Sequence, residues 1–210
     1  VRVLREAFFI ARSGRPGPVL VDITKDAQNQ LVDFVWTDEP IRLPGYRPNL
    51  SALPQEYERA IALLADADRP IILAGQGVIQ SGAGKELKAF CETNDVPVAM
   101  TLLGLGGLPA THPNNLGMMG MHGEAWVNEA IQEADLLLAF GMRFDDRAMG
   151  RFTDFNPNAK IILSSGMFER DVVSRLLRKG LRVAWISLGY GRSTGEEDTD
   201  LPLLQKFLAD

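Results

Sequence analysis

The stretch "RPIILAGQGVIQSGAGKELKAFCETNDVPVAMT" (Arg69–Thr101) decides the fold of this chain. It opens with an apolar run, "RPIILAG", and closes with a second one, "VPVAMT". Between them, "SGAGKELKAFCETND" has helical periodicity, with Ser81 as a suitable N-terminal cap. A strand, a helix and a strand in this order predict two parallel strands joined by a crossover helix.

The same alternation extends outward in both directions. On the N-terminal side, "PQEYERAIALLADAD" predicts an amphipathic helix with Pro54 in its first turn. On the C-terminal side, "GEAWVNEAIQEA" predicts a helix, and "DLLLAFG" and "AKIILSS" predict two more strands. We therefore expect an α/β fold with a doubly wound, mostly parallel, Rossmann-like sheet that helices cover on both faces.

The flanking regions have a different character. At the N-terminus, "VRVLREAFFIARSG" predicts a helix that ends near Gly14, and "PVLVDI" predicts a buried strand. Residues 27–51 lose the periodicity and are rich in proline, which favours a linker. We therefore divide the chain into residues 1–26, the linker 27–51, the doubly wound domain 52–163 and a tail, 164–210. In the tail, "LRVAWISLG" is a candidate strand to complete the sheet, between the predicted helices "RDVVSRLLRKG" and "LPLLQKFLAD".

Composition excludes several classes of protein. The 210 residues are 46% hydrophobic and 23% charged, which is ordinary for a globular protein, and the net charge of −5 argues against a nucleic-acid partner. No apolar stretch reaches the roughly 18 residues that a membrane span needs. The single cysteine, Cys91, forms no internal disulfide and fits a reducing, cytoplasmic setting. Because the chain opens inside a helical pattern without a methionine, we expect a piece of a longer protein.

Glycine-rich segments follow the predicted strands. In doubly wound sheets, ligands bind beyond the carboxyl ends of the strands, where this chain has "AGQGVIQSGAG", "TLLGLGGLP" and "GMRFDDRAMGR". A further loop, "GMMGMHGE", precedes a helix. Glycines let the backbone approach a large flat ligand, although each one alone also fits an ordinary turn. Gly75 and Gly77 begin a dinucleotide-binding pattern, but Gln80 stands where its third glycine belongs.

The segment "GMRFDDRAMGR" carries both signs of charge. Arg143 and Arg147 are suited to clamp phosphates, while Asp145 and Asp146 would orient these arginines or accept hydrogen bonds from a ribose. A solvated, salt-bridged loop is the alternative. His122, between glycines, is interpreted as facing a ligand, with a packed polar histidine as the alternative. Zinc-ligand spacing, a nucleophile and a general acid–base pair do not emerge, so these residues suggest a binder without its own chemistry.

The segments "SGRPGPVLVDITKDAQNQL", "RLPGY", "TLLGLGGLP", "GMMGMHG" and "FGMRFDDR" together resemble the large subunit of acetolactate synthase (acetohydroxyacid synthase), in order and over about residues 1–163. The resemblance implies a flavoprotein transferase that depends on thiamine diphosphate and magnesium. Its reaction condenses two 2-oxo acids, pyruvate with pyruvate or with 2-oxobutyrate, in branched-chain amino-acid biosynthesis. It also implies that residues 1–26 end a pyrimidine-binding domain and that residues 52–163 form the central FAD-binding domain.

Carried over residue by residue, the resemblance places a set of FAD contacts on the glycine-rich segments and on one N-terminal arginine. These are Arg15, Gly75, Gln76, Gly77, Thr101, Leu102, Leu103, Met121, His122, Gly141, Met142, Arg143, Asp145 and Arg147. Lys25, in "TKD" where the family has "PKD", would lie near the substrate entrance. The resemblance assigns no catalytic residue and no metal ligand to this chain.

The chain also departs from the family. The glutamate that activates thiamine lies upstream of residue 1 in the family, and the segment that holds magnesium and pyrophosphate lies downstream. After "AKII", "LSSGMFERD" replaces the family's "HVDID", whose acidic residues approach the adenosine of the flavin. We therefore expect that this chain alone is inactive and that its FAD binding is weak or lost. The family also implies a homo-oligomer, a dimer or tetramer, with a regulatory small subunit as a further partner.

Two other functions remain open at this point. One is a catalytically inert nucleotide-binding or regulatory module. The other is the central domain of a thiamine enzyme that lacks flavin. Both would keep the predicted fold. Retention of FAD separates the flavin-free enzyme from the leading interpretation, and thiamine-domain sequences in the flanking gene would separate the inert module from it.

Overall fold

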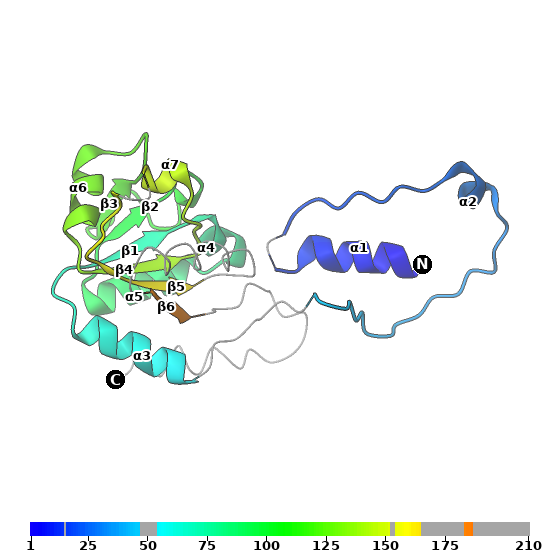
Figure 1. Ribbon diagram of the computed structural model, residues 1–210, viewed down its shortest axis with the longest axis horizontal. Helices are drawn as coiled ribbons and strands as arrows, with labels where there is room; N and C mark the ends of the chain where they lie inside the picture. The colour runs from blue at the N-terminus through cyan, green and yellow to red at the C-terminus, as the bar shows by residue number, and fades with distance from the viewer. Residues whose placement is uncertain (15, 47–53, 152–153, 165–182, 187–210) are drawn as a thin grey trace.

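A computed structural model of the chain describes residues 1–14, 16–46, 54–151, 154–164 and 183–186. Its main body contains a six-stranded sheet in the order β3-β2-β1-β4-β5-β6, in which all neighbouring strands are parallel (Figure 1). The strands are β1 (Pro70–Ala74), β2 (Val98–Met100), β3 (Asn115–Met118), β4 (Leu136–Phe140), β5 (Lys160–Ser164) and β6 (Val183–Ile186). This order is that of a doubly wound sheet, and the fold class expected from the sequence is confirmed.

Helices pack on both faces of the sheet because successive side chains of a strand point to opposite faces. On β1, Ile72 and Ala74 join a core that also contains residues of α3 (Pro54–Ala65), α4 (Gln76–Ser81) and α5 (Gly84–Asn94). Ile71 and Leu73 join a second core on the other face, with Val127 and Ile131 of α6 (Ala125–Glu133). Two buried faces explain why the central strands are continuous apolar runs.

Short elements differ from the sequence-based prediction. Ser81 does not cap a helix: it is the last residue of α4, a helix that the sequence did not predict. Gly82, at φ 76°, ends α4 in the left-handed conformation that glycine adopts without strain, and α5 begins two residues later. The single-turn elements η1 (Leu102–Gly104) and α7 (Asp146–Met149) were expected to be loop, as was the strand β3.

The N-terminal segment contains the predicted helix, α1 (Arg2–Arg12), and a short helix, α2 (Lys25–Asn29). The predicted strand "PVLVDI" is wrong, because residues 18–23 form no strand and Leu20 is 91% exposed. A strand needs a neighbour for its backbone N–H and C=O groups, and the structure pairs these residues with none of the described strands. The sequence pattern therefore shows β propensity without a partner.

Residues 36–46 return to α1 and hold this segment together. The Tyr46 hydroxyl donates to the Ser13 carbonyl at 3.0 Å, and its ring meets Phe9 edge to face at 6.0 Å between centroids. The Arg5 guanidinium donates to the Glu39 carbonyl at 2.8 Å. No residue of α1 is buried, so its apolar side chains are not packed into a core by the described residues of this segment.

Only part of the tail lies within the described residues. Its strand-like segment contributes β6, which pairs with β5 in register from Ile161–Val183 to Ser164–Ile186. The two predicted tail helices lie outside the described residues, as does the C-terminal part of the linker. The division into domains stays a prediction.

Asp135 joins the amino ends of three neighbouring strands. Its carboxylate accepts from the backbone N–H groups of Asp68 at 2.7 Å and Arg69 at 3.0 Å, directly before β1. Its own carbonyl accepts from Lys160 N at 2.9 Å, at the start of β5. Burial raises the pKa of Asp135, but the backbone hydrogen bonds and the charge of Arg69 together outweigh it, so the pKa lies below the ordinary value.

We expect Asp135→Asn to lower the free energy of unfolding by about 1 kcal/mol near neutral pH, because a charged acceptor of two hydrogen bonds is lost. The depressed pKa fixes the sign of the pH dependence. The carboxylate stabilises the fold fully at a pH above its pKa in the unfolded chain, near 3.8. This stabilisation is lost as the pH falls through its lower pKa in the folded protein. Urea denaturation between pH 7 and pH 3 measures it, with Asp68→Asn as the control. Equal curves for the two variants would contradict the assignment.

Candidate functional site

The centre of the candidate site is the point where β1 and β4 lie side by side. The strand order reverses there, since β2 and β3 follow β1 on one side and β5 and β6 follow β4 on the other. At such a switch point the loops that follow the two central strands, here β1 and β4, run in opposite directions. Doubly wound proteins bind ligands in the crevice that this leaves outside the carboxyl ends of the strands. We call the side on which β1 to β4 end the carboxyl edge.

Backbone contacts join the turns that follow β1 and β4. Gly75 N donates to the Phe140 carbonyl at 2.8 Å, and Gly77 N donates to the Gly141 carbonyl at 2.9 Å. A Cβ at Gly75 would overlap the Gly141 oxygen and the Cα of Met142. Glycine is therefore required at residue 75 by the close approach of two backbones. The N-terminal end of α4 reaches the carboxyl edge in this way.

The turn after β2 packs against the same place. Thr101 N donates to the Ala74 carbonyl at 2.9 Å, and a Cβ at Gly104 would overlap that carbonyl. Leu102 and Leu103, in η1, are 67% and 60% exposed, although both are large and apolar. Exposed leucines next to backbone packed this tightly provide an apolar surface at the carboxyl edge.

The loop between β3 and α6 joins the cluster through the loop after β4. Met121 N donates to the Arg147 carbonyl at 2.9 Å, and Gly120, at φ 99°, has no room for a Cβ beside the same carbonyl. Met121 and His122 are both exposed. A hollow of about 290 Å³ between α6 and α7 is lined by Gly120, Met121 and seven further residues.

The charged segment after β4 is organised around Asp145. Its Oδ2 accepts from Arg143 Nε at 2.8 Å, and its Oδ1 accepts from Ala148 N at 2.9 Å, which makes Asp145 the N-cap of α7. The Arg143 side chain is 59% exposed. The ion pair of this segment thus joins Arg143 to Asp145, and Arg147 is exposed on the following turn.

The structure brings most of the predicted contacts together along the carboxyl edge. Met142 is 4% exposed and packs in the second core, so a contact from it would come from its backbone. Lys25 is exposed at the start of α2, in the N-terminal segment. Arg15 lies outside the described residues. The assignment of all these residues to a cofactor stays a prediction.

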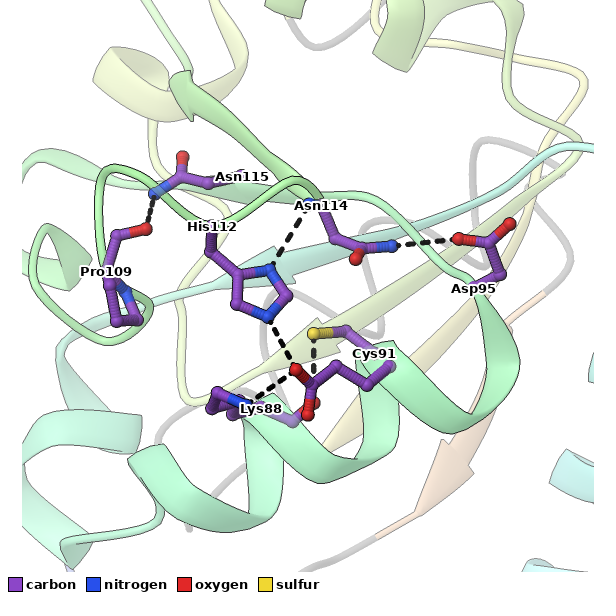
Figure 2. A network of polar contacts seen from close by, with 8 residues as sticks. Lys88, Cys91, Asp95, Pro109, His112, Asn114 and Asn115 are labelled. Carbon is purple, nitrogen blue, oxygen red and sulfur yellow. Dashed lines mark hydrogen bonds and ion pairs between the residues drawn. The ribbon is translucent and has the colours of Figure 1, made fainter.

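A second polar cluster, which the sequence did not predict, lies between α5 and the segment that leads into β3 (Figure 2). His112 Nε2 contacts Glu92 Oε1 at 3.1 Å, and its Nδ1 accepts from Asn114 N at 3.2 Å. The hydrogen bond from Lys88, at 2.6 Å, and then the one from His112 lower the pKa of Glu92. Because Asn114 leads into β3, this cluster positions an edge strand, and we assign it a structural role.

Metal-binding clusters and membrane-spanning helices are absent from the described parts of the chain. No three His, Cys, Asp or Glu side chains gather there into a possible metal site. No helix in the same residues is long and apolar enough to cross a membrane.

Residues 57–167 match the family described as "Thiamine pyrophosphate enzyme, central domain". The chain is 50% identical over 163 residues to acetolactate synthase 2, chloroplastic, of Nicotiana tabacum, an alignment that covers 77% of this chain and 24% of that protein. It is 48% identical over 161 residues to the acetolactate synthase large subunit of Corynebacterium glutamicum, covering 77% and 26%. An acetolactate synthase of Zea mays is also 48% identical, over 163 residues, covering 77% and 25%.

The chain thus spans about a quarter of the length of the curated relatives it matches. The resemblance to acetolactate synthase large subunits that the sequence motifs suggested is confirmed. The matched residues contain most of α3 and all elements from β1 to β5, and with them every strand end of the candidate site. The chain therefore belongs to the thiamine pyrophosphate enzyme family and carries its central domain.

Proposed function

We propose that this chain supplies the FAD-binding central domain of an acetolactate synthase, the enzyme that condenses pyruvate with pyruvate or 2-oxobutyrate. One observation carries the proposal: exposed apolar side chains and exposed arginines stand on loops that are joined around a single switch point, over turns that only glycine fits. An aliphatic surface suits a flat ring system, and guanidinium groups suit a pyrophosphate. The chemistry of these residues therefore fits FAD.

In this proposal the chain binds and orients the cofactor and performs no chemical step. Leu102, Leu103 and Met121 offer apolar surface, while Arg143 and Arg147 offer charged donors. The glycine turns at Gly75–Gly77 and Gly141 would let FAD approach the backbone. When bound, FAD has a structural role in the family, without a net redox step. Thiamine diphosphate and magnesium, which supply the condensation chemistry, would be held by other domains of the enzyme.

The test of this proposal is a flavin-fluorescence titration together with an activity assay of the 210-residue polypeptide. We expect FAD to bind, but more weakly than to a full-length acetolactate synthase, because the acidic "HVDID" residues of the family are replaced here. We expect no acetolactate from pyruvate with thiamine diphosphate and magnesium present. A protein that is folded by circular dichroism but binds no FAD would contradict the flavin role. It would favour the central domain of a flavin-free thiamine enzyme.

We also propose that the protein acts as a homo-oligomer in a reducing, cytoplasmic compartment, with a regulatory small subunit as a further partner. Support for self-association comes from the N-terminal segment, where Leu4 and Phe8 of α1 and Leu31, Phe34 and Trp36 are exposed. Several exposed apolar side chains in one segment favour association. Light scattering at high protein concentration should show species larger than a monomer. A monomer that persists at high concentration would contradict this expectation.

A further inference from the structure

Methionines gather at the carboxyl edge of the sheet. Those that the structure describes lie at the carboxyl ends of β2 and β3 or in the segments that follow β3 and β4. Met121 alone among them is exposed, at 60%. The others are half-buried or buried, and they are Met118 and Met149, and Met100, Met119 and Met142. One exposed thioether thus stands among shielded ones.

A tightly packed turn presents Met121 to solvent. Gly123 N donates to the Gly120 carbonyl at 3.0 Å, which closes a turn with Met121 and His122 at its two central positions. Asn128 holds Gly120 from both sides, because its Oδ1 accepts from Gly120 N at 2.9 Å and its Nδ2 donates to the Gly120 carbonyl at 3.0 Å. Neither glycine of the turn has room for a Cβ. The exposure of Met121 is therefore a property of the folded backbone.

Access to the sulfur decides how fast a peroxide oxidises a thioether. Hydrogen peroxide transfers one oxygen atom: an S–O bond forms as the O–O bond breaks, the sulfur loses two electrons, and the other oxygen leaves as water with both protons. The product is methionine sulfoxide, a polar group in place of an apolar one. Met119 and Met142 are each 4% exposed, so peroxide reaches their sulfur atoms only when the structure opens. Oxidation of Met121 needs no such opening.

We infer that Met121 is an oxidative modification site, at which hydrogen peroxide reacts before it oxidises the other described methionines. The sulfoxide adds a hydrogen-bond acceptor at a residue to which the proposed function gives a role in the apolar surface for FAD. Oxidation therefore weakens FAD binding, and this consequence rests on the proposed function. The selectivity for Met121 does not, since it follows from exposure. Because methionine sulfoxide reductases restore the thioether, the modification is reversible.

The inference is tested by timed exposure of the folded 210-residue chain to hydrogen peroxide, with tandem mass spectrometry to assign each added oxygen to a residue. We expect Met121 to be oxidised roughly tenfold faster than Met119, in line with their exposed fractions of 60% and 4%. Met121→Leu should lose this fast reaction. Met118→Leu, the control on a half-buried neighbour, should keep it. In urea all methionines should react at similar rates, because the fold no longer shields any of them.

Oxidation of Met119 or Met142 as fast as that of Met121 in the folded protein would overturn the inference. A flavin-fluorescence titration measures the consequence for FAD: protein oxidised at Met121 should bind roughly 3- to 10-fold more weakly, and a sulfoxide reductase should restore binding. The same peroxide treatment should leave the affinity of Met121→Leu unchanged. Equal affinity before and after oxidation of Met121 would contradict the effect on FAD. Folded, unoxidised protein that binds no FAD would overturn the proposed function, and the order of oxidation would still decide the modification site.

Discussion

Replacement of Gly75 by alanine is expected to lower the free energy of unfolding by about 3 kcal/mol and to abolish FAD binding, because the added methyl group has no space. Its Cβ would overlap the Gly141 carbonyl oxygen and the Cα of Met142. Both are backbone atoms, so no side-chain rotation can relieve the overlap. The turns after β1 and β4 would have to separate, which breaks the hydrogen bonds from Gly75 N to Phe140 O and from Gly77 N to Gly141 O.

The measurement is chemical denaturation of wild type, Gly75→Ala and a control. Gly17→Ala is that control, because a Cβ at Gly17 meets nothing within 4 Å and its backbone needs no positive φ. We expect the control to unfold like the wild type and Gly75→Ala to unfold at much lower denaturant. Equal midpoints would show that the turns can separate at little cost. FAD titration of the Gly75→Ala protein that remains folded would then show whether the switch point still binds FAD.

The central strands could be predicted from the sequence because their information is local. Two buried faces require continuous apolar runs, and glycine or proline bounds each run, as in "RPIILAG" and "DLLLAFG". The glycines at the strand ends then placed the candidate site by a general rule of doubly wound sheets. Neither step required knowledge of which strands are neighbours.

Strand β3 was missed because its stabilisation comes from elsewhere in the chain. It contains Asn115 and Gly117, which have low β propensity, and its residues are only half-buried. Side chains satisfy its backbone: Met118 N donates to Glu124 Oε2 at 2.7 Å, and Trp126 Nε1 donates to the Leu116 carbonyl at 3.2 Å. "PVLVDI" is the reverse case, with a strong local pattern and no neighbouring strand. In both segments the tertiary environment, and not the local sequence pattern, decides whether a strand forms.

The pairing within the charged segment could not be predicted either. Spacing alone allows either aspartate to pair with either arginine. The formation of α7, with Asp145 as N-cap and Gly150 following the last turn, selects the pair Arg143–Asp145. An aspartate five residues before a glycine is a weak signal for so short a helix, because four residues cannot stabilise a helix by themselves. The geometry of the site therefore depends on packing around α7.

Arg143→Ala is expected to weaken FAD binding by roughly 10- to 100-fold, which corresponds to about 1.5–3 kcal/mol for a charge-assisted interaction with phosphate. Arg147→Ala should have a smaller effect. Arg143 is held by Asp145 at 2.8 Å, so little side-chain freedom is lost on binding. Arg147 is exposed, and the carboxylate that could restrain it, Asp145, is already engaged. An unrestrained arginine has to lose its rotamer entropy before it can bind.

The measurement is a flavin-fluorescence titration of wild type, Arg143→Ala and Arg147→Ala at fixed ionic strength, with circular dichroism to confirm folding. Raising the salt concentration should weaken FAD binding by the wild type more than FAD binding by Arg143→Ala, because the variant has lost a charged contact with phosphate. If all three proteins bind FAD equally, the charged segment is a solvated, salt-bridged loop. A larger loss for Arg147→Ala would show that restraint by Asp145 does not decide which arginine binds the pyrophosphate.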